Sequence, residues 1–260
     1  MVDCGSVMGN GGHHPRRLSG VKMNFRDSGY ALTYLGLAGI LFVSIIGLEY
    51  APGLKPCTGG GCWGAPEAYR IIYLHVPFAW CSFLAYCVLF IGSVAWYARR
   101  SELGWRMICT GSDLALLFGL GVVISGPIWG SAEWGVPWDW GDLRLNTYGL
   151  LTGVTLFLVL ARGSQPDGQG TRDTIAAIGL FGFALVPVTA LATTWYQERH
   201  PGIVVIESEE SGLAPEILAV MLSGFASFVL LFAGLAILTD ALHRMESRLS
   251  HLQRQLDKGA

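Results

Sequence analysis

The chain has 260 residues, of which 52% are hydrophobic and only 14% are charged. A soluble domain carries about 25% charged residues, so this composition excludes an ordinary soluble globular protein and indicates a membrane protein. The formal net charge of -2 is uninformative as a total, but its distribution along the chain is informative. We expect membrane lipid around the chain and no nucleic-acid partner.

Residues 1–29 precede the first apolar run and are rich in Gly, His and Arg. They lack the apolar region of a cleavable signal peptide, so the first apolar run is predicted to be an uncleaved anchor. The low complexity of the segment favours a disordered tail over a metal site. We expect residues 1–29 to form a cytoplasmic N-terminal tail.

Six apolar segments follow, each long enough for a helix to cross about 30 Å of hydrocarbon. They cover residues 30–48, 71–96, 108–128, 143–160, 174–195 and 215–238. Lipid offers no hydrogen-bond partner to the backbone, so each segment is predicted to be helical. The fold class is therefore an all-α membrane protein with six transmembrane helices in one domain, residues 30–240. Pro187 lies in the middle of its span and predicts a kink there.

The basic residues predict the orientation. An even number of spans places both termini on one side of the membrane. With the termini inside, 13 of the 17 lysines and arginines lie inside, and only four lie outside: Lys55, Arg70, Arg144 and Arg199. The positive-inside rule therefore predicts cytoplasmic termini.

Residues 241–260 are predicted to form a cytoplasmic C-terminal helix. Leucine or methionine recurs every three or four residues from Leu242 to Leu256. This stripe fits a helical extension of the last span that lies against the inner membrane surface. It also fits a docking helix for a cytoplasmic partner or a second copy, and two heptads are too few to decide.

A Trp-rich stretch, residues 129–145, joins the third and fourth spans. It contains four of the nine tryptophans, at Trp129, Trp134, Trp138 and Trp140. Interspersed glycines and a proline predict an irregular loop, which lies outside on the predicted topology. Enrichment of Trp at membrane interfaces explains single residues, whereas four within twelve residues favour a flat apolar platform for a ligand such as heme.

Two of the six histidines, His75 and His200, come to the level of this loop, while His13, His14, His243 and His251 fall in the inner tails. Taken singly, such a histidine is more often an interfacial residue hydrogen-bonded to a neighbour. Neutral imidazole is, however, a common axial ligand of heme iron, and two imidazoles complete six-coordination. A closed zinc site usually needs four protein ligands, so heme is the better candidate.

The outer arginines are candidates for the two heme propionates, because a guanidinium matches a carboxylate. The candidates are Arg144, Arg70 and Arg199, although loop or headgroup ion pairs explain Arg70 and Arg199 equally well. Cys57 and Cys62 fall in the oxidising compartment, where they can form a disulfide or remain two free thiols.

These motifs resemble the heme-handling WWD family of cytochrome c maturation proteins. The Trp-rich loop, residues 70–77 around His75 and residues 186–200 ending at His200 carry the resemblance, which covers about residues 30–240. Six spans and this chain length suit the smaller members of the family.

Two positions in the loop depart from the family pattern. Pro137 stands where the family usually has another Trp, and Gly141 is inserted before Asp142. The family's Asp role can therefore fall to Asp139 or to Asp142.

The resemblance implies that heme b is held non-covalently and transiently on the periplasmic side of a bacterial inner membrane. It implies that His75 and His200 are the axial ligands. The implied platform consists of Trp129, Trp134, Gly135, Trp138, Asp139, Trp140 and Asp142.

The resemblance also implies partners: a CcmE-like heme chaperone, the ATP-binding-cassette subunits CcmA and CcmB, and the small protein CcmD. The protein would transfer heme rather than act as an enzyme. The chain has no nucleotide-binding loop, so any ATP hydrolysis would belong to a partner.

Two other functions stay open at this stage. A b-type electron-transfer subunit would hold heme between spans with pairs of histidines, yet only His75 lies within a predicted span. A scaffold without a ligand would use the Trp-rich loop only to dock a partner.

Overall fold

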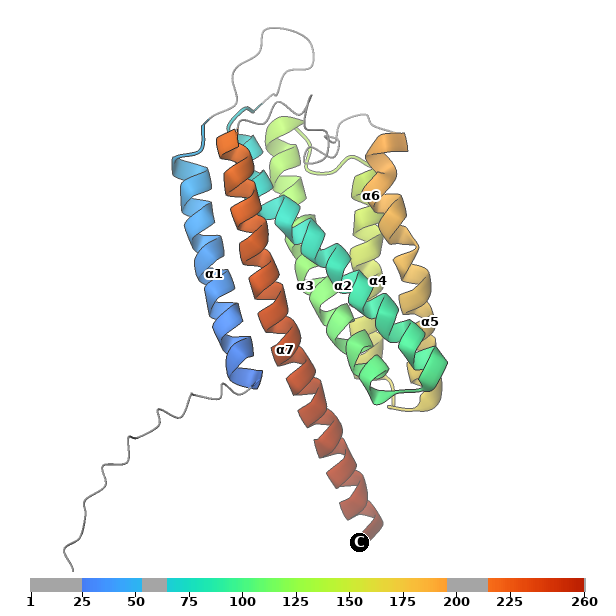
Figure 1. Ribbon diagram of the computed structural model, residues 1–260. Coiled ribbons are helices and arrows are strands. Elements are labelled where there is room, and N and C mark those ends of the chain that lie inside the picture. Colours follow the sequence, from blue (N-terminus) through green and yellow to red (C-terminus); the bar gives the residue numbers. More distant parts are fainter. Residues whose placement is uncertain (1–24, 53–64, 196–214, 260) are drawn as a thin grey trace, which may run out of the picture.

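The computed structural model describes residues 25–52, 65–195 and 215–259, and every regular element in these ranges is a helix (Figure 1). The helices are α1 (Phe25–Glu49), the 3-10 helix η1 (Ala68–Ile71), α2 (Ile72–Arg99), α3 (Glu102–Glu133), α4 (Leu143–Ser164), α5 (Gln169–Phe183), α6 (Leu185–Trp195) and α7 (Pro215–Gly259). Six helical stretches are long and apolar enough to cross a membrane, with α5 and α6 sharing one of them. The predicted fold class is confirmed.

Helices α2 and α3 form a tight hairpin. Ser101 caps α3, because its side chain accepts a hydrogen bond from the Gly104 amide at 3.1 Å. Glycines let the two backbones approach: a Cβ added at Gly111 would lie 2.6 Å from the Leu89 amide nitrogen, and one at Gly104 would lie 2.8 Å from the Trp96 nitrogen. Small residues at such crossings are how helices pack closely within a membrane.

The Gly111→Val variant is therefore expected to lose about 1–3 kcal/mol of stability, because the backbone of Leu89 leaves no room for a side chain. Unfolding of the purified protein in detergent measures this loss. Gly153→Ala in α4 is the matched control, since nothing lies within 4 Å of a Cβ added there. Equal stabilities of the two variants would contradict close α2–α3 packing.

Helix α1 packs beside α7 (Figure 1). Its Gly36 lies directly on the backbone of Leu231, and Gly39 lies on the side chain of Ser227. From the other side, Gly234 of α7 lies on the backbone of Thr33. The first and last described helices are thus joined by a seam of small residues.

The predicted kink at Pro187 is confirmed as a break between α5 and α6. Helix α5 ends at Phe183 and α6 begins at Leu185. Proline lacks the amide hydrogen that would bond to the carbonyl four residues earlier, and its ring clashes with that carbonyl, which belongs to Phe183. Ala184 instead donates to the Phe181 carbonyl at 3.1 Å, a tighter turn that separates the two helices.

An ionic cluster joins α3, α4 and α7 at the end of the bundle opposite the Trp-rich loop. The Asp113 carboxylate of α3 contacts Arg162 of α4 and lies 2.8 Å from Nε2 of His243 in α7. Nδ1 of His243 lies 3.0 Å from a Glu246 oxygen. His243, predicted to lie in the inner C-terminal segment, is only 9% exposed, because α7 continues into this contact.

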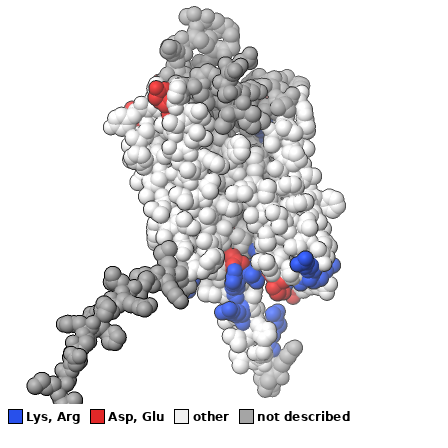
Figure 2. Space-filling view, viewed as in Figure 1, with Lys and Arg blue, Asp and Glu red and all other residues white. Residues whose placement is uncertain are grey.

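Charged side chains gather at this same end. Figure 2 shows most of the described arginines at this end, around the α2–α3 and α4–α5 turns and on the lower half of α7, while the flank of the bundle in that view is almost free of charge. In the α4–α5 turn, Arg172 donates to both carboxylate oxygens of Asp167, at 2.7 and 2.9 Å, and this hydrogen bonding lowers the pKa of Asp167.

Helix α7 is continuous from Pro215 to Gly259, so residues 241–259 extend the last span as one helix. The predicted leucine stripe lies on its lower half, and its members are exposed: Leu242, Met245, Leu249, Leu252 and Leu256.

Candidate functional site

The irregular part of the Trp-rich stretch is shorter than predicted. Only residues 134–142 lie outside helices, and they connect α3 to α4. Trp129 and Gly130 belong to the last turns of α3, where the Trp134 amide donates to the Gly130 carbonyl at 2.8 Å. A glycine costs a helix about 1 kcal/mol, which the packing of α3 overrides.

Two of the predicted platform residues end the flanking helices. Gly135 follows the last residue of α3 with φ of +74°, a left-handed conformation that favours glycine and terminates a helix. Asp142 is buried and caps α4, since its Oδ1 accepts from the Leu145 amide at 2.9 Å. Asp139 lies within the loop, where its Oδ1 accepts from the Gly141 amide at 2.9 Å.

The four indoles do not form one flat surface, contrary to the expectation from sequence. Trp129 and Trp134 meet edge to face, with centroids 4.8 Å apart and planes inclined by 64°. Trp138 and Trp140 form a second pair at 5.9 Å and 56°. Trp129 is buried at 8% exposure, whereas Trp140 is 83% exposed and is the indole with the most open face.

Asn146, which sequence reasoning missed, fastens the loop to α4. Its Nδ2 donates to the Trp140 and Asp142 carbonyls, both at 2.8 Å, and its Oδ1 accepts from the Trp138 indole at 3.1 Å. Gly149, one turn further along α4, makes room for the same indole, because an added Cβ would lie 3.2 Å from Trp138. The sequence does carry a signal for this role: Asn146 follows the helix-capping Asp142 by one helical turn.

The Asn146→Ala variant is expected to release residues 138–142 from α4, because three hydrogen bonds are lost at about 1 kcal/mol each. Faster hydrogen–deuterium exchange of peptides from this loop measures the release. The control is Thr147→Ala, since the Thr147 hydroxyl bonds to the Leu143 carbonyl of its own helix and not to the loop. Exchange that matches the wild type would show that Asn146 does not hold the loop.

Helix α2 begins at the end of the bundle that carries the loop (Figure 1), and His75 lies half-buried one turn into this helix. Its Nδ1 lies 2.8 Å from Oγ of Ser125 in α3, and a Cβ added at Gly126 would lie 3.4 Å from ring atom Cε1. His200 and Arg199 lie outside the described residues, as do Cys57 and Cys62.

The two described candidate arginines tie helices together. The half-buried Arg144 donates from Nη2 to the Ala190 carbonyl at 2.9 Å and from Nε to the Thr189 carbonyl at 3.4 Å, which joins α4 to α6. Arg70 donates from Nε to Glu67 at 2.7 Å and from Nη1 to the Gly47 carbonyl at 2.7 Å, which joins η1 to α1.

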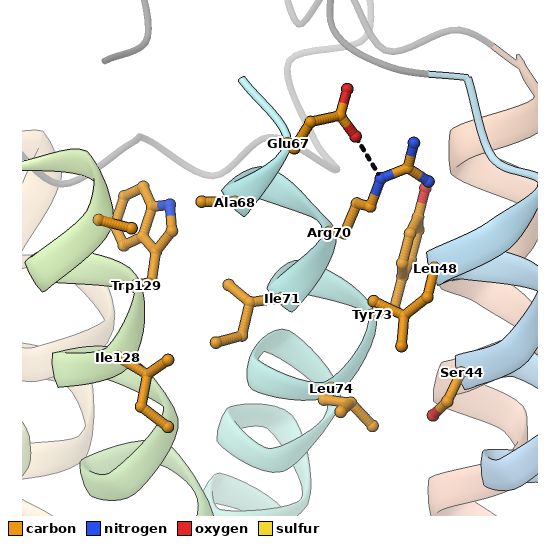
Figure 3. A pocket seen from close by; sticks show the side chains of 11 residues that line it. Ser44, Leu48, Glu67, Ala68, Arg70, Ile71, Tyr73, Leu74, Ile128 and Trp129 are labelled. Carbon is orange, nitrogen blue, oxygen red and sulfur yellow. Dashed lines mark hydrogen bonds and ion pairs between the residues drawn. The ribbon is translucent and has the colours of Figure 1, made fainter. Parts of the chain in front are cut away.

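Arg70 also borders a cavity of about 270 Å³ between α1, α2 and α3. Its wall is largely apolar and includes Ile71 of η1, Leu74 of α2, and Ile128 and Trp129 of α3 (Figure 3). His75 does not line this cavity. Of the predicted site residues, the structure therefore brings Arg70 together with Trp129, and places Trp138, Trp140, Asp139 and Asp142 together over the start of α4.

The fold and the Trp-rich loop define an integral membrane protein with six apolar helical spans and one end rich in indoles. Residues 31–255 match the family model for heme exporter protein C, so the chain belongs to that family, a transporter-type membrane subunit with a role in heme export for cytochrome c maturation.

Similar proteins come from bacteria and from plant mitochondria. A ccmC-like mitochondrial protein of cytochrome c biosynthesis from Marchantia polymorpha is 27% identical over 192 residues, which cover 72% of this chain and 78% of the relative. Heme exporter protein C of Bradyrhizobium diazoefficiens is 25% identical over 195 residues, covering 73% and 74%. Heme exporter protein C of Paracoccus denitrificans is 25% identical over 210 residues, covering 77% and 87%.

Proposed function

We propose that this protein holds heme b non-covalently at the end of the bundle that carries the Trp-rich loop and delivers it to a CcmE-like heme chaperone. The observation that carries the proposal is an imidazole, His75, held between α2 and α3 at that end. His200 is the second axial ligand in this proposal.

The chemistry of the donor set supports heme over a bare metal ion. A porphyrin supplies four iron ligands, so the protein needs only axial ligands, and imidazole is a common one. Among the residues that the structure describes, no group of three or more His, Cys, Asp or Glu could hold a metal ion. An imidazole, His75, and an exposed indole, Trp140, at the same end of the bundle suit heme as the cargo.

The distribution of charge supports an outward-facing site. In the proposed topology, the end with α2–α3, α4–α5 and the lower half of α7 faces the cytoplasm, where positive charge is favoured. Most of the described arginines lie there (Figure 2), whereas Arg70 and Arg144 lie at the opposite end. Both termini are then cytoplasmic, and the Trp-rich loop faces the periplasm across the bacterial inner membrane. A phosphatase fusion inserted in the loop and a fluorescent-protein fusion at the C-terminus would both be active.

CcmA, CcmB and CcmD are the proposed partners within the export system, and CcmA would supply ATP hydrolysis. In this scheme the chain transfers heme and catalyses no reaction. Its own residues bind, orient and release the cargo: His75 supplies an imidazole nitrogen, Trp140 supplies an aromatic face, and Asn146 holds that face in place.

Heme transfer tests the proposal directly. Purified protein in lipid nanodiscs is loaded with heme and mixed with the soluble domain of a CcmE-like chaperone, and the absorption spectra of both are recorded after separation. Heme is expected to move to the chaperone. A stable, stoichiometric heme that stays on the protein and is reversibly reduced by quinol would instead establish a b-type electron-transfer subunit.

A further inference from the structure

We infer that Ser125 is a positioning residue for the heme ligand: its hydroxyl fixes the tautomer and the orientation of His75, so that Nε2 is the nitrogen that meets iron. This inference rests on the proposed function, in which His75 is an axial ligand. It adds a residue of α3 that belongs to none of the sequence motifs.

The hydrogen bonds of Ser125 determine where the imidazole proton lies. The hydroxyl donates to the Gly121 carbonyl of its own helix at 2.6 Å. A serine hydroxyl has one hydrogen to donate, so toward His75 it acts as the acceptor. The contact at 2.8 Å is therefore Nδ1–H donating to Oγ, and the lone pair of the neutral ring lies on Nε2.

Packing holds the ring in that position. Gly126 follows Ser125, and a methyl group there would meet Cε1 at 3.4 Å, an ordinary van der Waals contact that confirms the ring lies against α3. One turn earlier, Gly121 lies directly on the ring of Phe78 in α2. Gly121 lets α2 and α3 approach closely at this level, where the side chains of His75 and Ser125 bond.

The expected effect follows from how such partners act on a ligating histidine. An acceptor for Nδ1–H makes the imidazole a stronger base and fixes its orientation, and loss of such partners typically weakens metal affinity by about 10–100-fold. A more basic ligand also stabilises ferric over ferrous iron. Ser125→Ala should therefore weaken heme binding by about 10–100-fold and raise the reduction potential of bound heme.

The variants are chosen to separate this role from packing. Ser125→Thr keeps a hydroxyl at the same place and should restore affinity and potential. Ser131→Ala is the matched control, since the Ser131 hydroxyl also donates to a carbonyl four residues earlier in α3, Pro127 at 2.8 Å, but is exposed at the helix end. Gly126→Ala alters the volume beside the ring and keeps the hydrogen bond, so it should leave the potential unchanged.

Four measurements are made on the full chain in nanodiscs: the dissociation constant of heme, the reduction potential, the thermal unfolding of the heme-free protein, and the ¹⁵N chemical shifts of the His75 ring without heme. The ¹⁵N shifts should show a proton on Nδ1 in the wild type and a mixture of tautomers in Ser125→Ala.

The outcomes distinguish the positioning role of Ser125 from the ligand role of His75. Weaker heme binding and a raised potential in Ser125→Ala, with rescue by Ser125→Thr and unchanged unfolding, support the inference. Wild-type affinity and potential in Ser125→Ala, while His75→Ala loses heme, would overturn the inference and leave the proposed function standing. Heme retention with an unchanged spectrum in His75→Ala would overturn the ligand assignment and the inference with it.

Discussion

The His75→Ala variant is expected to be recovered from membranes without heme, and to bind added heme with an affinity reduced beyond the roughly 10–100-fold that loss of an outer-shell partner causes. The proposed iron–imidazole bond would be lost in this variant, and the described residues of α2 and α3 around position 75 offer no second imidazole. Absorption in the Soret region and titration with heme measure the loss.

The control for this variant is His251→Ala, which removes an exposed histidine from the far end of α7. Its heme content should equal that of the wild type. A His75→Gly variant adds a positive test, because exogenous imidazole can enter the vacated space beside Gly126 and restore the six-coordinate spectrum. A wild-type spectrum in His75→Ala would show that another residue binds the iron.

The Asp113→Ala variant is expected to destabilise the protein by up to about 3 kcal/mol, because it removes the carboxylate partner of the half-buried Arg162 and one of the two carboxylates beside His243. Asp113 holds both Arg162 and His243, from two different helices, so its loss weakens the attachment of α4 and of α7 to α3. Denaturation of the purified protein in mixed micelles measures the change.

Two further variants make this measurement specific. Asp257→Ala removes an exposed carboxylate at the end of α7 and should change stability by about 0.5 kcal/mol or less. In the Asp113→Ala, Arg162→Ala double variant the unpaired arginine is gone as well, so the total loss should be smaller than the sum of the single losses. Strictly additive losses would show that the two side chains are not coupled.

The helices and their order could be predicted from sequence, because a run of about 20 apolar residues spans the hydrocarbon and must be helical there. The break beside Pro187 was predictable for a similarly local reason, the missing amide hydrogen. The full extent of the irregular loop was not predictable: Trp129 and Gly130 look like loop residues, yet the packing of α3 keeps them helical.

The contacts between helices could not be predicted from the sequence. Ser125 meets His75 from 50 residues away, and Asp113 meets His243 from 130 residues away. Each pairing depends on the rotation and the axial register of two helices, which the hydropathy pattern leaves free. The candidate ligand His75 was therefore found by residue type and depth, whereas the serine bonded to it was found only from the structure.

The seam between α1 and α7 has a consequence for how the protein is made. Helix α1 is the first described helix to leave the ribosome, and it packs mainly on α7, the last. Until residues 215–259 have been synthesised, the glycine-lined face of α1 therefore has only lipid or a helper protein to cover it. Membrane assembly ends with the closure of this seam, and a chain truncated before α7 leaves its first helix as an isolated span.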